Sequence, residues 1–231
     1  MGDVEPHRAV LPLLEAIQGR SIAAAAEVCL PAGALGAARI TRLTAELLVL
    51  RSKSKLWVTA ELAPGGSLDE GALARGGYLA DAAVTRARRF TRGDDAFTWL
   101  VEEGIDTFEH ERLLPLPDPE RLAEALASVA PLRPWAPLAR PPARLVGLGL
   151  GRDEELGLLG LVKIHRDVER LEEDDRALRD AGFLGDPDAD TWALASGAAS
   201  VVFAGGTVVG VLGPVPESGV GWPRGPRHAG T

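Results

Sequence analysis

The chain has one cysteine, few aromatic residues and no asparagine. A lone cysteine, Cys29, excludes an intrachain disulfide and any zinc or iron–sulfur site built from several cysteines. Because aromatic residues make up only 5% of the chain, Leu, Val and Ala must fill most of a core. The local sequence AAAAEVCL offers no base to activate the thiol, so we expect Cys29 to be a small buried side chain.

Lysine is also scarce, since only Lys53, Lys55 and Lys163 accompany the many arginines. With abundant Ala, Gly, Leu and Pro, this skew indicates a genome rich in G and C, as in many bacteria, rather than a functional use of arginine. The net charge of −8 and the isoelectric point near 5.1 disfavour broad attraction to nucleic acid or anionic membranes.

Long apolar runs are missing, and no stretch reaches the roughly 18 residues of a membrane span. The start, MGDVEPHRAV, has no basic region leading into an apolar run, so we expect no secretory signal. Pro6 stands where a myristoylation signal needs Ser or Thr. These features predict a cytoplasmic protein that does not enter a membrane.

The 231 residues suffice for one large domain or two small ones. Apolar residues recur at helical spacing over 9–30, and Gly19 would divide this segment into two shorter helices. Two apolar or alternating runs, 46–50 and 55–62, flank a basic loop and predict a β-hairpin.

The next segments predict further helices and strands. Ser67 and Glu70 match a capping box, and a helix is expected over 78–90, with arginines in its last turn. The run 96–104 predicts a strand or a short helix, and 107–117 an edge segment. Pro119 suits the first turn of a helix over 119–130.

The second half follows a proline-rich segment, 131–142, which we expect to be extended chain. A strand over 145–150, a charged helix over 162–182 and a hairpin turning at Gly205-Gly206 come next. The mixed order predicts an α+β fold of helices and short antiparallel strands with at least two hairpins. The expected regions are an α+β region at 1–130, a proline-rich linker or strap at 131–142, a second α+β region at 143–216 and a flexible tail at 217–231.

Alternating glycines in GLGLG, 147–151, are reminiscent of a dinucleotide-binding loop. The pattern needs a third glycine where Arg152 stands, and the acids that follow would repel a pyrophosphate. The phosphate-binding pattern GxxxxGK[ST] is also missing, because none of the lysines follows a glycine. We therefore expect no cofactor.

Acidic residues gather at 172–175, and paired carboxylates can bind a divalent cation or share a proton. Arginines at three- and four-residue spacings favour a solvated helix face instead. Asp175 lies on the apolar stripe of the expected helix, so it could mark a contact with a partner. The run DPDAD lacks the later glycine and glutamate of a calcium loop, and no metal site is expected.

His110, flanked by Glu109 and Glu111, is the candidate acid or base of the chain. No histidine pair has metal-ligand spacing and no GxSxG motif occurs, so no catalytic residue is assigned. A second candidate feature is an arginine cluster at 86–92 around Phe90, which could contact nucleic acid.

The leading hypothesis is a non-catalytic protein-interaction subunit of a cytoplasmic multi-protein system, with another protein as its partner. Its candidate interaction surface consists of Arg86, Arg88, Arg89, Trp135 and Asp175, with Trp135 expected to be exposed among prolines. Two alternatives stay open. One is an enzyme whose site assembles from distant residues around His110 or the 172–175 carboxylates, and the other is nucleic-acid binding through 86–92.

Overall fold

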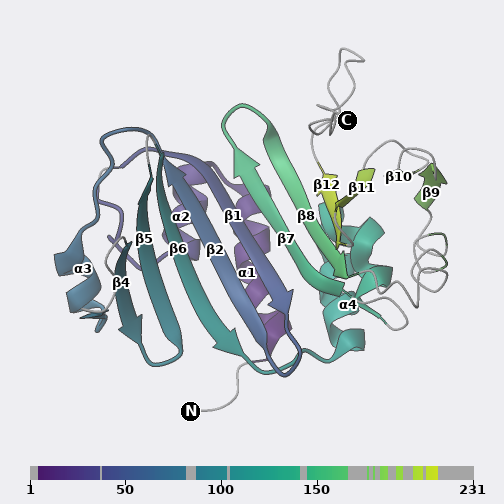
Figure 1. Ribbon diagram of the computed structural model, residues 1–231, viewed down its shortest axis with the longest axis horizontal. Helices are drawn as coiled ribbons and strands as arrows, with labels where there is room; N and C mark the ends of the chain where they lie inside the picture. The colour runs from purple at the N-terminus through teal and green to yellow at the C-terminus, as the bar shows by residue number, and fades with distance from the viewer. Residues whose placement is uncertain are drawn as a thin grey trace, which may run out of the picture.

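A computed structural model of the chain forms one twelve-stranded antiparallel sheet with helices packed on one face (Figure 1). The structure describes residues 5–36, 38–81, 87–102, 105–140, 145–165, 176, 179, 183–186, 191–194, 200–204 and 207–212. The strand order is β3-β4-β5-β6-β2-β1-β7-β8-β12-β11-β10-β9, with most neighbours in the sheet adjacent in sequence. The α+β class and the expected hairpins are confirmed.

The strands divide into six before the proline-rich segment and six after it. The first set is β1 (Ile40–Val49), β2 (Ser54–Leu62), β3 (Leu79–Asp81), β4 (Ala87–Arg92), β5 (Asp95–Glu102) and β6 (Ile105–Leu114). The second is β7 (Leu145–Asp153), β8 (Gly157–His165), β9 (Phe183–Asp186), β10 (Thr191–Leu194), β11 (Ser200–Ala204) and β12 (Thr207–Leu212). Because β1 pairs with β7, strands from both sides of 131–142 lie in one sheet.

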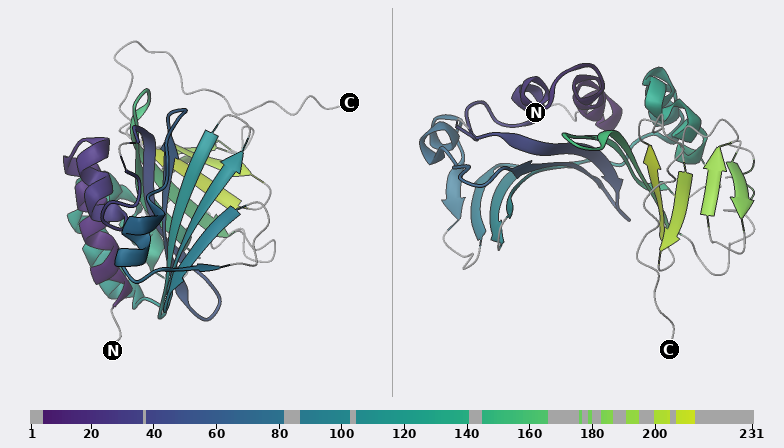
Figure 2. Two further views of the ribbon diagram at one scale, coloured as in Figure 1. Left: turned by 90° about the vertical axis from the view of Figure 1, so that its left-hand side faces the viewer. Right: turned by 90° about the horizontal axis from the view of Figure 1, so that it is seen from above.

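The helices α1 (Pro6–Gly19), α2 (Ile22–Cys29) and α4 (Pro119–Ser128) lie on the outer, convex side of the curved sheet (Figure 2). The short helix α3 (Glu70–Arg75) stands near the β4 edge. The core fills the space between helices and sheet. The opposite, concave face carries no helix among the described residues, so in this part of the chain helices cover one side of the sheet only.

The division of the first segment into two helices is confirmed. Val10, Leu14 and Ile17 are buried along one side of α1, as a helix packed on a sheet requires. The helix ends at Gly19, and the Ser21 side chain accepts a hydrogen bond from the Ala24 amide at the start of α2.

The expected β1–β2 hairpin is also confirmed. Every second residue of β2 from Leu56 to Leu62 is buried, while the residues between them are half-buried. This alternation places the buried set toward the helices and Trp57, Thr59 and Glu61 toward the concave face.

The helix expected over 78–90 is wrong, because β3 and β4 occupy its described residues. The apolar residues have helical spacing, but residues 87–92 form a strand because they pair with β5, with Phe90 opposite Phe97. The segment 107–117 is not at an edge either. Its strand β6 lies between β5 and β2.

The N-cap of α3 also differs from the expectation. The helix begins at Glu70, and the Asp69 carboxylate accepts from the Ala72 amide at 2.8 Å. Asp69 therefore replaces Ser67 as the capping residue. The helix that begins at Pro119 is confirmed as α4, with Asp118 accepting from the Arg121 amide at 3.1 Å.

The proline-rich segment is not extended, because residues Ala130–Ala139 form a 3-10 helix, η1. Leu132, Trp135 and Leu138 are fully buried and stand three residues apart, which is one turn of a 3-10 helix. Trp135, expected to be exposed, is therefore a core residue with 0% of its surface accessible.

The charged helix expected over 162–182 is wrong in its first residues, since β8 continues to His165. Residues 166–175, including the 172–175 carboxylates, lie outside the described part, and residues 176 and 179 are helical. The hairpin over Gly205-Gly206 is confirmed by the pairing of β11 with β12 from Ala204↔Thr207 onward. The expected tail, 217–231, also lies outside the described residues.

Candidate functional site

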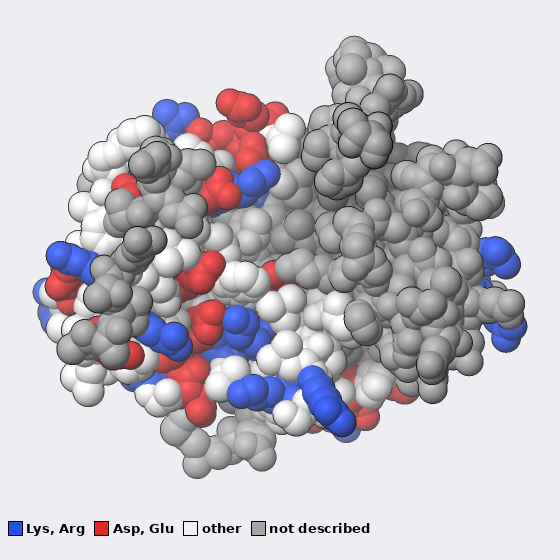
Figure 3. Space-filling view, in the orientation of Figure 1, with Lys and Arg blue, Asp and Glu red and all other residues white. Residues whose placement is uncertain are grey.

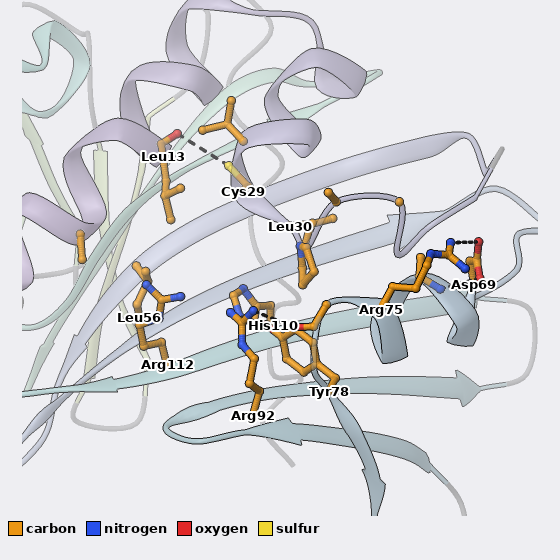
Figure 4. A pocket seen from close by; sticks show the side chains of 17 residues that line it. Leu13, Cys29, Leu30, Leu56, Asp69, Arg75, Tyr78, Arg92, His110 and Arg112 are labelled. Carbon is orange, nitrogen blue, oxygen red and sulfur yellow. Dashed lines mark hydrogen bonds and ion pairs between the residues drawn. The ribbon is translucent and has the colours of Figure 1, made fainter. Parts of the chain in front are cut away.

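A cleft of about 780 Å³ opens between the segment after α2, helix α3 and strands β4 and β6 (Figure 4). One wall is apolar and comes from α1, α2 and residues 30–33. The other is polar and carries Arg92, His110, Arg112 and Tyr78. The cleft lies on the helix-covered side of the sheet, and its volume falls within the range of small-molecule sites.

A buried carboxylate, Asp95, organises the polar wall. Arg112 donates from Nε at 2.5 Å and from Nη2 at 3.2 Å, while Arg92 Nη2 donates at 2.9 Å. Burial alone would raise the pKa of Asp95, but the hydrogen bonds and charges of both arginines outweigh burial and hold that pKa below its ordinary value. One carboxylate thus fixes two guanidinium groups.

Strand register brings these residues together. Asp95 stands opposite Arg112 of β6 and, across the β4–β5 turn, opposite Arg92 of β4. His110 stands opposite Phe97, two positions further along. Because side chains alternate along a strand, all of these point to the same face of the sheet.

His110 completes the cluster. Its Nε2 lies 3.4 Å from the Tyr78 hydroxyl and 3.9 Å from Asp95 Oδ1, and the ring also hydrogen bonds to the backbone of Cys29. Burial lowers the pKa of His110, against the opposing charge of Asp95 and with the help of Arg112. The imidazole is therefore neutral at pH 7.

Two further groups at the cleft, Cys29 and Tyr78, keep their protons at pH 7. Burial raises the pKa of the Cys29 thiol to about 12, and burial together with Asp95 raises the pKa of Tyr78. Cys29 Sγ lies 3.9 Å from the carbonyl oxygen of Leu13. The cleft therefore offers fixed guanidinium groups and neutral hydrogen-bonding side chains rather than an activated thiolate.

The concave face of the sheet is a second candidate surface, seen face-on in Figure 3. Red and blue groups are interspersed over the part formed by described residues. Trp57 and Thr59 lie half-buried near its centre on β2. Strand register places on this face the carboxylates Glu46, Glu61, Asp81, Glu109, Glu111 and Asp153 and the cations Arg42, Lys55 and Arg89.

Two of these cations, Arg42 and Lys55, form ion pairs with three of the carboxylates. Arg42 reaches Glu61 at 3.3 Å and Asp153 at 3.1 Å, and Lys55 binds Glu111 at 2.8 Å. Lys55 also lies 4.6 Å from the centre of the Trp57 ring. Burial and the neighbouring Glu111 raise the pKa of Glu109, against the opposing effect of Lys55. The surplus of carboxylates makes this face acidic.

The glycines of 147–151 lie within β7 and do not form a loop. Gly147 and Gly149 stand opposite Leu48 and Glu46 of β1 on the concave face. A Cβ on Gly149 would lie 2.5 Å from Glu46 Cβ. Their role is close strand packing on the inner side of the curve.

Comparison with protein-family models, curated proteins and solved structures gives no match. The described residues contain no group of three His, Cys, Asp or Glu side chains placed to hold a metal ion. Within the same residues, no helix has the length and apolar character to cross a membrane.

The residues of the predicted interaction surface do not gather in one place. Arg88 pairs with Glu70 and lies 5.7 Å from the centre of the Trp99 ring, on the helix side of β4. Arg89 is next along the strand and faces the opposite side. Trp135 is in the core, and Arg86 and Asp175 lie outside the described residues.

His110 is the predicted residue that the structure places in a cleft. Sequence reasoning missed its partners Asp95, Arg112 and Tyr78, and it assigned Arg92 to the arginine cluster at 86–92 rather than to a site with His110. A signal existed, because Asp95, Phe97 and Trp99 alternate along one strand while Phe108, His110 and Arg112 alternate along the next. Recognising β5 and β6 as a hairpin would have aligned Asp95 with Arg112. Tyr78 comes from a different segment, between α3 and β3, and the sequence predicted this segment as the start of a helix.

Proposed function

We propose that the chain is a non-catalytic interaction subunit of a cytoplasmic multi-protein system, and that its partner protein docks on the concave face of the sheet. The observation that carries this proposal is the one-sided cover of the sheet, with α1, α2 and α4 on the convex side (Figure 2). A sheet commonly buries one face and leaves the other to water. Here the face without helices also carries the half-buried Trp57, close to the ion pairs of Arg42 and Lys55.

The composition of this face indicates the chemistry of the partner. Tryptophan is enriched where binding energy is concentrated, and Trp57 lies centrally on β2 with Lys55 held over its ring. The excess of carboxylates around it favours a partner surface carrying lysine or arginine next to an apolar side chain. Glu109 is the best candidate for a new ion pair, because no ion pair joins it to a described residue.

Charge reversal on the concave face tests the proposal. Tagged full-length chain, expressed in its own cells, should capture a defined partner, and the purified pair should bind with an affinity that falls as salt increases. Glu109→Arg should weaken binding of the purified partner by about tenfold or more, since it turns attraction into repulsion. Thr59→Arg, beside Trp57, should act likewise through bulk and charge.

Glu15→Arg is the matched control, because it makes the same charge change at an exposed position of α1 on the convex side. It should bind as the wild type does. Binding that survives Glu109→Arg and Thr59→Arg, or that Glu15→Arg weakens equally, would rule out the concave face. A chain that captures no partner in its own cells would contradict the function itself.

A further inference from the structure

The charges at the cleft do not balance among the described residues. Arg92 and Arg112 share the one carboxylate of Asp95, while Arg75 and Asp69, 3.7 Å apart, compensate each other. His110 is neutral, as is Tyr78. One positive charge is thus left over at the polar wall, on guanidinium side chains that are 46% exposed at Arg92 and 36% exposed at Arg112.

The opposite wall would meet an apolar group. Leu13, Val28, Leu30 and Pro31 line it, and Val28 is 39% exposed although it stands next to the buried Cys29. Figure 4 shows Leu13 and Leu30 on one side of the space and Arg92, Arg112 and Tyr78 gathered on the other. A ligand that suits both walls carries one negative charge at one end and an apolar chain at the other.

We propose that this cleft binds a carboxylate attached to an apolar chain, with the carboxylate seated at Arg92 and Arg112. Guanidinium groups donate strong hydrogen bonds to carboxylates, and Asp95 holds both groups in place before the ligand arrives. Because Asp95 takes Nε and Nη2 of Arg112, the ligand would meet the remaining N–H groups. A single carboxylate neutralises the surplus charge, whereas a phosphate dianion would exceed it. The Tyr78 hydroxyl and His110 ring stand within the same cluster as further hydrogen-bonding groups.

Two sources can supply this chemistry, a free aliphatic acid or the C-terminus of a peptide ending in an apolar residue. Calorimetry with the full chain distinguishes them by using octanoate, octylamine, octanol, inorganic phosphate, and a leucine-terminated peptide with a free or an amidated end. Octanoate, the free peptide or both should bind with one site per chain, and the amine, alcohol and amidated peptide should not. Comparable binding of octanol, octylamine or phosphate would overturn the proposal, as would failure of both carboxylates to bind.

Two substitutions locate the site. Arg112→Gln should weaken carboxylate binding by about tenfold or more, because a charge-assisted pair is lost. Val28→Glu keeps the Asp95 network intact and brings a negative charge to an exposed position on the cleft wall, so it should weaken binding even if Arg112→Gln does not fold. Val28→Gln is the control of similar size and should bind normally. Unchanged affinity in folded Val28→Glu would place the ligand elsewhere and overturn the proposal.

Failure of this proposal would leave the proposed function standing, because the cleft and the concave face lie on opposite sides of the sheet.

Discussion

At the scale of single residues, burial decides which chemistry the cleft can perform. Asp95 is 8% exposed and keeps its charge because Arg92 and Arg112 bind it, whereas Cys29, 3% exposed and without a cation to stabilise a thiolate, keeps its proton. Two buried residues near the same cleft therefore differ in charge: the carboxyl group of Asp95 is ionised and the thiol of Cys29 is not. The residue types alone could not predict these two protonation states, since the charge of Asp95 depends on Arg112, on the next strand, as well as on the nearby Arg92.

Cys29 should resist alkylation in the folded protein. With a pKa of about 12, only about one thiol in ten thousand is ionised near pH 8, and the sulfur is buried. Iodoacetamide should therefore label the folded chain at least about 100-fold more slowly than the chain in concentrated urea, as measured by mass spectrometry over time. Complete labelling of the folded chain at the rate seen in urea would show an exposed, ordinary thiol.

His110 and Asp95 should make the protein sensitive to acid. Burial lowers the pKa of His110 from 6.5, so the unfolded chain takes up a proton at a pH where the folded chain does not. The resulting loss of stability is absent above about pH 6.5 and grows as the pH falls toward the lowered pKa of the folded state. Asp95, whose pKa lies below 3.8, adds a second loss at lower pH, once the unfolded carboxyl is protonated.

Urea unfolding between about pH 8 and pH 5 measures the first of these effects. The free energy of unfolding should fall over this range in the wild type and fall less in His110→Gln, whose side chain cannot take up the proton. The same fall in both proteins would show that His110 does not cause it.

At the scale of elements, local pattern predicted some segments and failed on others for identifiable reasons. The alternation of β2 and the capping of α4 are local signals, and both segments have the predicted structure. The segment 87–92 has apolar residues at helical spacing, but it forms a strand because Phe90 and its neighbours pair with β5. Prolines suggested extended chain at 131–142, whereas a three-residue repeat of Leu132, Trp135 and Leu138 buries one side of a 3-10 helix.

The residues of the cleft show the same contrast between local signals and strand pairing. His110 could be selected because it is a titratable residue between two acids. Its partners could not, because they are brought to it by strand register, which local sequence does not determine. Arg92, Asp95 and Arg112 lie on three consecutive strands, so a correct pairing of β4, β5 and β6 would have been needed to bring them together.

Gly149 should be essential to the approach of β7 to β1. A methyl group there would lie 2.5 Å from Glu46 Cβ and 2.7 Å from Glu46 Cα, which requires a backbone shift. Gly149→Ala should lower the free energy of unfolding by about 1–3 kcal/mol, measured by urea denaturation. Gly19→Ala is the control, since nothing lies within 4 Å of its Cβ, and it should be neutral or stabilising by up to about 1 kcal/mol. Equal stabilities of the two variants would contradict this close packing.

At the scale of the whole molecule, the curved sheet separates two environments. Its convex side packs against α1, α2 and α4 and contains the cleft around Asp95, whereas its concave side presents Trp57 and an excess of carboxylates (Figures 2 and 3). Among the described residues, arginines form ion pairs on both sides of the sheet, including Arg42 with Asp153 and Arg88 with Glu70. The proposed protein partner and the proposed anionic ligand would therefore bind on opposite sides of the sheet.

Hydroxyl-radical footprinting of the purified complex tests the concave face most directly. Oxidation of Trp57 should fall severalfold when the partner is bound, while that of Val28 on the convex side should not change and the buried Trp135 should stay protected throughout. An unchanged rate at Trp57, with new protection on α1 or α4 instead, would contradict docking on the concave face.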